Sequence, residues 1–148
     1  MESSSERIPD FRGDGYLPEG LHVASLADVT SRFGDGNRQR QRLMIRLVRW
    51  VELSLTVKAK RLFVDGSFVT AKELPNDVDA VVQLPNDFRE QLKGGSNAAI
   101  ELEEMLLTRQ PQEIFAAEDD RDWNDWLEFF SRTRESDHRR KGLIEIQL

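Results

Sequence analysis

The stretch GSFVTAKELPNDVDAVV, residues 66–82, places two acids one residue apart in a run that otherwise resembles a buried strand. Residues i and i+2 of a strand point to the same face, so Asp77 and Asp79 are expected to share one face. Two carboxylates brought to about 4 Å repel by roughly 4 kcal/mol at an intermediate dielectric, and a divalent cation reverses that cost. The pair therefore predicts a site for Mg²⁺ or Mn²⁺. The alternative is that both acids are solvated where the strand leaves the loop Pro75-Asn76.

A Gly-Ser pair ends the preceding apolar segment, ten residues before the first of these acids. Gly66 and Ser67 are residues that a tight strand-to-helix turn favours. Backbone N–H groups that point outward at such a turn, with the hydroxyl of Ser67, are suited to hold a phosphate. Lys72 in the following loop either neutralises a triphosphate or is a solvated loop lysine.

Composition limits the class of protein. The 148 residues suffice for one domain, and no apolar run approaches the roughly 20 residues of a membrane helix. The polar N-terminus does not resemble a secretory signal, so we expect a cytoplasmic protein without a membrane contact. The absence of cysteine excludes thiolate zinc sites and cysteine nucleophiles, and the net charge of −6 leaves room only for local contact with nucleic acid.

Hydrophobic periodicity and turn residues predict one α+β domain over residues 21–148, preceded by a flexible arm over residues 1–20. We expect a mixed sheet of about four strands flanked by helices. The predicted helices cover residues 25–34, 38–58, 96–109 and 122–133, with a short helix between the first two strands. The predicted strands cover residues 61–65, 77–84, 112–116 and 142–148.

The spacing of the motif also supports a resemblance to a known superfamily. An apolar residue, any residue, Gly-Ser, nine further residues and then Asp-Val-Asp-Ala resemble the signature of the nucleotidyltransferases with a polymerase-beta-like fold. More narrowly, YLPEGLH, FVDGSFVTAKELPNDVDAVV and RRKGLIEIQL look like segments of small bacterial nucleotidyltransferase-like proteins of uncharacterised function. This resemblance extends from Tyr16 onward and implies a minimal nucleotidyltransferase fold.

The resemblance implies roles for individual residues. Gly66 and Ser67 would contact the nucleotide phosphates, while Asp77 and Asp79 would ligate the metals. Active members usually carry a third acid on a following strand, which helps to deprotonate the attacking hydroxyl. Glu113 is the best candidate for this catalytic and metal-binding acid, and Glu145 on the last predicted strand is the fallback.

Two functions follow as expectations. The first is a metal-dependent nucleotidyltransferase that moves a nucleoside monophosphate from a nucleoside triphosphate to a hydroxyl of protein or RNA. The resemblance suggests a bacterial toxin–antitoxin or defence module. The alternative is a catalytically weak, nucleotidyltransferase-like protein that binds a partner such as a toxin. A basic segment near the C-terminus either grips a nucleotide or acceptor or forms a solvated turn; its members are Arg132, Arg134, Arg139, Arg140 and Lys141.

Overall fold

The computed structural model describes residues 8–108 and 113–148, and it confirms an α+β fold. A five-stranded mixed sheet has the order β1-β5-β2-β3-β4, one strand more than the expected four. The strands are β1 (Gly20–Ala24), β2 (Arg61–Asp65), β3 (Asp79–Gln83), β4 (Ile114–Ala117) and β5 (Gly142–Ile146). β2 runs antiparallel to both β3 and β5, whereas β1 pairs parallel with β5 and β4 pairs parallel with β3.

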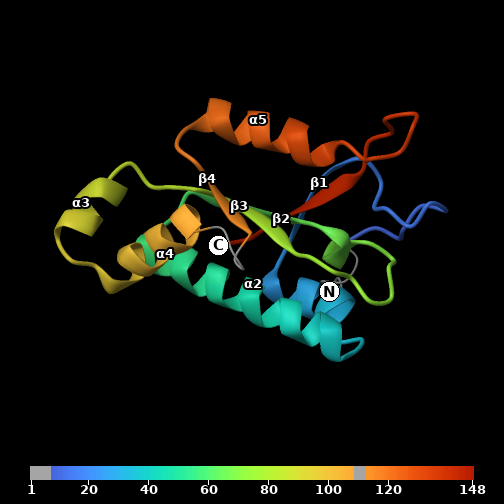
Figure 1. Cartoon of the computed structure of the whole chain (residues 1–148), viewed down its shortest axis with the longest axis horizontal. Helices are drawn as coiled ribbons and strands as arrows, with labels where there is room; N and C mark the ends of the chain where they lie inside the picture. Colours follow the sequence, from blue (N-terminus) through green and yellow to red (C-terminus); the bar gives the residue numbers. More distant parts are fainter. Residues whose placement is uncertain (1–7, 109–112) are drawn as a thin grey trace, which may run out of the picture.

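Helices lie on both faces of the sheet (Figure 1). α2 and α4 lie on one side of the sheet in this view, and α5 lies on the other. The helices are α1 (Leu26–Val29), α2 (Arg38–Val57), α3 (Phe88–Lys93), α4 (Asn97–Thr108) and α5 (Asp120–Ser131). A π-helical turn, Thr30–Gly34, extends α1, and a 3-10 turn, Ser67–Val69, takes the place of the short helix expected after β2.

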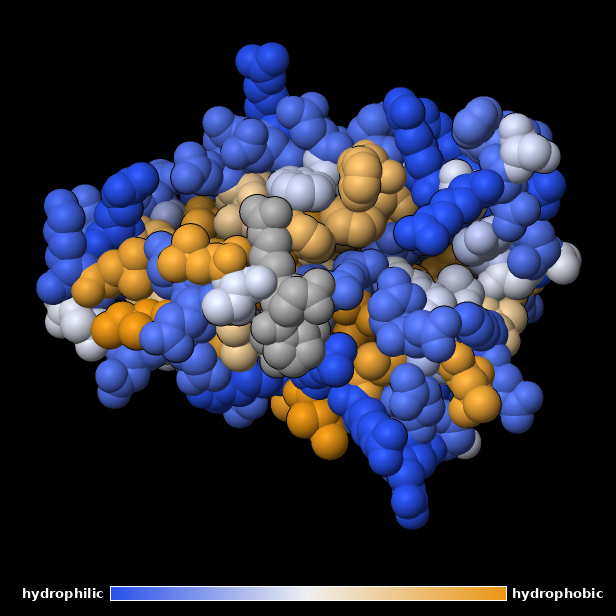
Figure 2. Space-filling model, viewed as in Figure 1, coloured by the Kyte–Doolittle hydropathy of each residue, from blue (hydrophilic) through white to orange (hydrophobic). Residues whose placement is uncertain are grey.

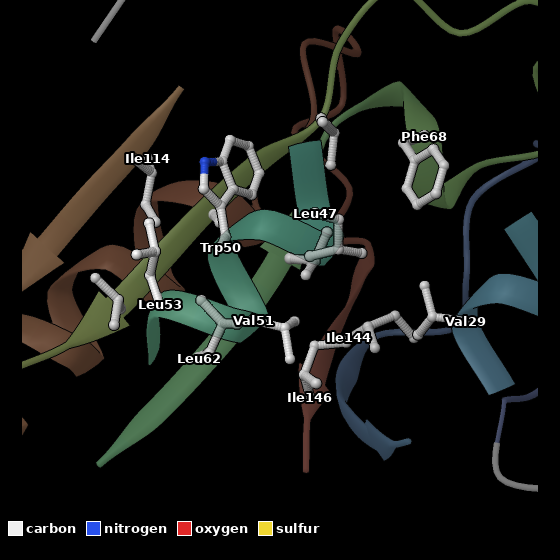
Figure 3. Close-up of a cluster of buried hydrophobic side chains, with 14 of the residues drawn as sticks. Val29, Leu47, Trp50, Val51, Leu53, Leu62, Phe68, Ile114, Ile144 and Ile146 are labelled. Atoms are coloured by element: carbon white, nitrogen blue, oxygen red, sulfur yellow. The ribbon is translucent and has the colours of Figure 1, made fainter. Parts of the chain in front are cut away.

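The main core lies between α2 and the sheet. Buried Leu47, Trp50 and Val51 of α2 pack toward Leu62 and Ile144 on the strands (Figure 3). Since every described apolar side chain of this group is at most 8 % exposed, burial of this face supplies most of the hydrophobic stabilisation. Apolar residues at three- and four-residue steps, among them Leu43, Leu47 and Val51, form the buried face of α2, whereas Leu55 is 52 % exposed.

A second, smaller core lies under α5. Phe63 of β2 makes an edge-to-face contact with Trp123, with ring centroids 5.1 Å apart, and Val81 and Leu143 complete this buried cluster. Neighbouring residues of β2 alternate between the two cores: Leu62 and Val64 belong to the α2 core and Phe63 to the α5 core. The odd-numbered residues of β2 and β3, which include two acids, therefore face the α5 side of the sheet.

Residues 8–20 pack against the domain in the region for which an arm was expected. Ile8 and Leu17 are buried in the main core, and the N–H of Ala71 donates a hydrogen bond to the carbonyl of Gly15. On the face shown in Figure 2, hydrophilic side chains dominate and the apolar side chains form small patches between them. Every described helix is too short or too polar to cross a lipid bilayer.

Candidate metal centre

Three acids meet at the α5 side of the sheet, where β2 ends and β3 and β4 begin. One carboxylate oxygen from each of Asp77, Asp79 and Glu113 lies within 4.8 Å of the other two. The parallel register of Ala80 with Ile114 explains this convergence, because it places Glu113 beside Asp79. The N–H of Ala80 donates a 3.0 Å hydrogen bond to the carbonyl of Glu113 and fixes that register. The three acids form a group able to hold a metal ion.

The electrostatics of this group favour a cation. Burial raises the pKa of Asp79 to about 9, together with its hydrogen bond to Glu113 and the charges of Asp77 and Glu113. Without a cation, Asp79 therefore keeps its proton at neutral pH. A hard divalent ion would replace that proton, since it prefers carboxylate oxygens and offsets their mutual repulsion.

Asp77 is held differently, although it lies two residues before β3 and not within the expected strand 77–84. Burial raises its pKa, but hydrogen bonds from the hydroxyl and the N–H of Ser67 outweigh this effect, so the pKa of Asp77 is lowered. The two bonds reach the same oxygen of Asp77, Oδ1, at 2.5 Å and 3.0 Å. Ser67 thus positions an ionised carboxylate at the edge of the metal group.

Two physical reasons require glycine at position 66, in the turn after β2. Its φ of +96° lies in the region that side chains rarely adopt, and a Cβ there would lie 2.8 Å from the carbonyl oxygen of Asp77. The N–H groups of this turn are already bonded within the protein. That of Ser67 donates to the carboxylate of Asp77, and those of Phe68 and Val69 donate to the carbonyls of Asp77 and Gly66. Because these N–H groups already have partners, the prediction of a phosphate contact is supported only by the place of the turn in the site.

Two members of the metal group, Asp77 and Asp79, line a cleft of about 850 Å³ that also contains Gly66 and Ser67. The C-terminal part of α5 and Asp14, Gly15 and Tyr16 form further walls. Four cationic side chains line the cleft: Lys72, Arg132, Arg134 and Lys141. A polar cleft of this size, with acids in one wall and cations around it, fits a small polyanion together with a metal ion.

The basic segment divides into two groups. Arg139 pairs with Asp137 and Asp14, Arg132 and Arg140 both pair with Glu128, and Lys141 pairs with Asp65. Within the described part of the chain, Lys72 and Arg134 have no ion pair, and both are exposed at the cleft. These two side chains are therefore available to an anionic ligand.

The fallback acid, Glu145, does not join the metal group. It lies on β5, where Arg61 donates hydrogen bonds of 2.8 Å and 2.6 Å to its two carboxylate oxygens. Of the two candidate acids, Glu113 is the one that lies beside Asp77 and Asp79.

Sequence reasoning missed one ion pair at the site. The ammonium of Lys141 lies 2.8 Å from both carboxylate oxygens of Asp65, the last residue of β2. Burial raises the pKa of Asp65, and the adjacent Lys141 opposes this rise. The two residues are 76 positions apart, so no local pattern could have linked them.

Comparison with known proteins gives one match. A family model described as "Family of unknown function (DUF6932)" matches residues 9–147. No curated protein and no solved structure matches this chain. Because the matched region covers nearly the whole sequence, the chain belongs to this family of unknown function.

Proposed function

We propose that this protein is a metal-dependent nucleotidyltransferase that moves a nucleoside monophosphate from a nucleoside triphosphate to a hydroxyl of protein or RNA. The observation that carries the proposal is the convergence of Asp77, Asp79 and Glu113 beside a cleft that is lined by the two aspartates and by the Gly66-Ser67 turn. Mg²⁺ or Mn²⁺ would be held by the three carboxylates, and it would supply charge neutralisation of the phosphates and of the leaving group.

The transfer would proceed as an in-line displacement. The acceptor oxygen forms a bond to the α-phosphorus, while the bond from that phosphorus to the bridging oxygen breaks. Pyrophosphate leaves with the electron pair, and the proton of the hydroxyl passes to a carboxylate of the group, for which Glu113 is the candidate. Lys72 and Arg134 at the cleft would offset the charge of the triphosphate.

The cleft also offers an aromatic surface for a nucleobase. Phe129 is 64 % exposed and lines the cleft next to Phe130, with ring centroids 5.1 Å apart. An exposed ring beside cations is suited to stacking a base, and stacking tolerates every base because each has a π-face. We therefore propose a nucleotide, in preference to a bare polyphosphate, as the ligand.

The first experiment is a calorimetric titration with ATP in the presence of Mg²⁺. We expect metal-dependent binding by the wild type and none by the double variant Asp77→Asn with Asp79→Asn. Asp125→Asn serves as the matched control, since Asp125 is an exposed acid of α5 that does not line the cleft. Wild-type protein that fails to bind ATP with the metal would refute the nucleotide site.

A second experiment separates transfer from binding. The alternative is a catalytically weak protein of the same fold that binds a partner, for example within a toxin–antitoxin module. Incubation with α-labelled ATP, CTP, GTP or UTP and cell lysate should move label to protein or RNA. The label must disappear in the Glu113→Gln variant. Binding without any label transfer would favour the alternative.

A further inference from the structure

The ion pair between Lys141 and Asp65 lies in the cleft itself. Both residues line it, and their side chains are only 13 % and 3 % exposed. Asp65 stands opposite Asp79 in the antiparallel pairing of β2 with β3, so the pair adjoins the metal group directly. An ion pair that serves only the stability of the fold could lie anywhere in it. This one is buried next to the acids proposed to hold the metal.

The geometry leaves one donor of Lys141 for a ligand. An ammonium carries three N–H donors, and the two carboxylate oxygens of Asp65 accept two of them. No other hydrogen-bond acceptor for this ammonium occurs among the described residues, and the centroid of the Tyr16 ring lies 6.0 Å from it. The third N–H is therefore available on the cleft side.

Backbone hydrogen bonds hold the chain at Lys141 and at the next residue, Gly142. The N–H of Lys141 donates to the carbonyl of Ser131, and that of Gly142 donates to the carbonyl of Leu17. A Cβ on Gly142 would lie 2.1 Å from the carbonyl oxygen of Pro18, so the chain passes this point in close contact with the segment before β1. Lys141 is held at its backbone by these contacts and at its ammonium by Asp65.

An anion bound in the cleft would need a hydrogen-bond donor of this kind. The N–H groups of the Gly66 turn are bonded internally, and Lys72 extends from an exposed loop on a flexible stem. A cation that is already immobilised loses less conformational entropy when it binds an anion. Of the lysines that line the cleft, Lys141 is the pre-organised one.

We propose that Lys141 donates its third N–H to a non-bridging phosphate oxygen of the metal-bound nucleotide, and that Asp65 is the residue that positions it. This inference rests on the proposed function and adds a phosphate subsite to it. Because a lysine is a point charge with rotatable donors and lacks the planar two-pronged head of an arginine, the subsite would recognise the charge of the phosphate and not the arrangement of its oxygens.

The test must keep the fold intact. Removing one partner of a buried ion pair leaves an uncompensated charge, whereas replacing both partners with neutral side chains of similar size is often tolerated. The double variant Asp65→Asn with Lys141→Met is therefore the main test. Lys93→Met, at an exposed lysine of α3 away from the cleft, is the matched control.

Calorimetry would measure binding of Mn²⁺ alone and of ATP with Mg²⁺. In the double variant we expect about tenfold weaker binding of the nucleotide, the effect of one lost charge-assisted hydrogen bond, and unchanged binding of Mn²⁺. The Lys93→Met control should bind both as the wild type does.

Three outcomes would overturn the inference. Unchanged nucleotide affinity in the double variant would make the ion pair purely structural. Equal loss of Mn²⁺ and nucleotide binding would mean that the pair shapes the metal group and does not contact phosphate. Wild-type protein that binds no nucleotide would overturn the proposed function, and the subsite with it.

Discussion

The carboxyl groups of Asp79 and Glu113 lie close together across the parallel pair β3–β4, with one oxygen of each within 4.8 Å of the other. Two acids this close favour a proton between them, and burial together with the neighbouring charges raises the pKa of Asp79 to about 9. In the metal-free protein, the cluster therefore binds a proton where a cation would bind in the loaded protein. This relationship gives the first prediction.

The metal-free protein should lose stability as pH rises from about 4 to about 9. The unfolded chain releases the Asp79 proton near its ordinary pKa of 3.8, whereas the folded chain keeps it to about 9. Because the folded state keeps this proton in this window, the free energy of unfolding falls with rising pH, by at most about 1.4 kcal/mol per pH unit for the Asp79 proton alone. Urea unfolding in EDTA at several pH values measures this slope.

Two comparisons complete this test. Asp79→Asn should flatten the slope and stabilise the metal-free protein at pH 8, while Asp125→Asn should leave the slope unchanged. Added Mn²⁺ should raise the melting temperature of the wild type more at pH 8 than at pH 5, because the ion must displace the proton. A stability that rises with pH between 5 and 8 in EDTA would contradict the assignment of the proton.

The second prediction contrasts two glutamates. Glu113→Gln should abolish or strongly weaken Mn²⁺ binding, because it removes a charged ligand from the metal group. Glu145→Gln should keep Mn²⁺ binding and cost on the order of 1 kcal/mol of stability, since it weakens the bidentate pair with Arg61. Titration of both variants with Mn²⁺ and their urea unfolding give the two readouts. Normal Mn²⁺ binding by Glu113→Gln would remove Glu113 from the site.

The sequence predicted most of the fold because its long periodic segments carry strong patterns. The 20-residue α2 and the apolar β2 and β5 lie close to their expected positions. β1 was missed because it is a five-residue edge strand that pairs only with β5, a partner more than 100 residues away. The six-residue α3 was missed because it spans too few turns for a clear helical period.

At the site, too, residues that lie close together in the sequence were easier to predict than contacts between distant segments. Gly66, Ser67, Asp77 and Asp79 were found because one short stretch contains all four. Glu113 was a candidate because it precedes apolar residues of a predicted strand, whereas the parallel pairing of that strand with β3 was not predicted. The partner of Asp65 could not be predicted, because the contact depends on how the turn before β5 packs against the end of β2.

The third prediction concerns Arg40, which is buried and donates hydrogen bonds to four backbone carbonyls. Two of them, from Thr70 and Lys72, belong to the loop that borders the cleft; the other two are those of Phe33 and Phe68. Arg40→Met keeps the apolar stem but leaves these carbonyls without a donor. We expect a loss of about 2–4 kcal/mol of stability and faster amide hydrogen exchange over residues 67–77.

An exposed arginine of the same helix provides the control. Arg42→Met should change neither quantity, since Arg42 is exposed on α2. Unchanged exchange over residues 67–77 in Arg40→Met would show that other contacts hold the loop.

The fourth prediction concerns the exposed ring of Phe129. If a nucleobase stacks on it, Phe129→Ala should weaken ATP binding by about 1–3 kcal/mol and leave the binding of inorganic triphosphate unchanged. The ring also contacts Trp126 and Phe130, so the melting temperature must be measured alongside. Leu107→Ala, at a residue of α4 that is 75 % exposed, is the control for loss of surface apolar area. Phe129→Tyr keeps an aromatic face and should restore binding. Equal losses for ATP and for inorganic triphosphate would mean that Phe129 shapes the cleft and contacts no base.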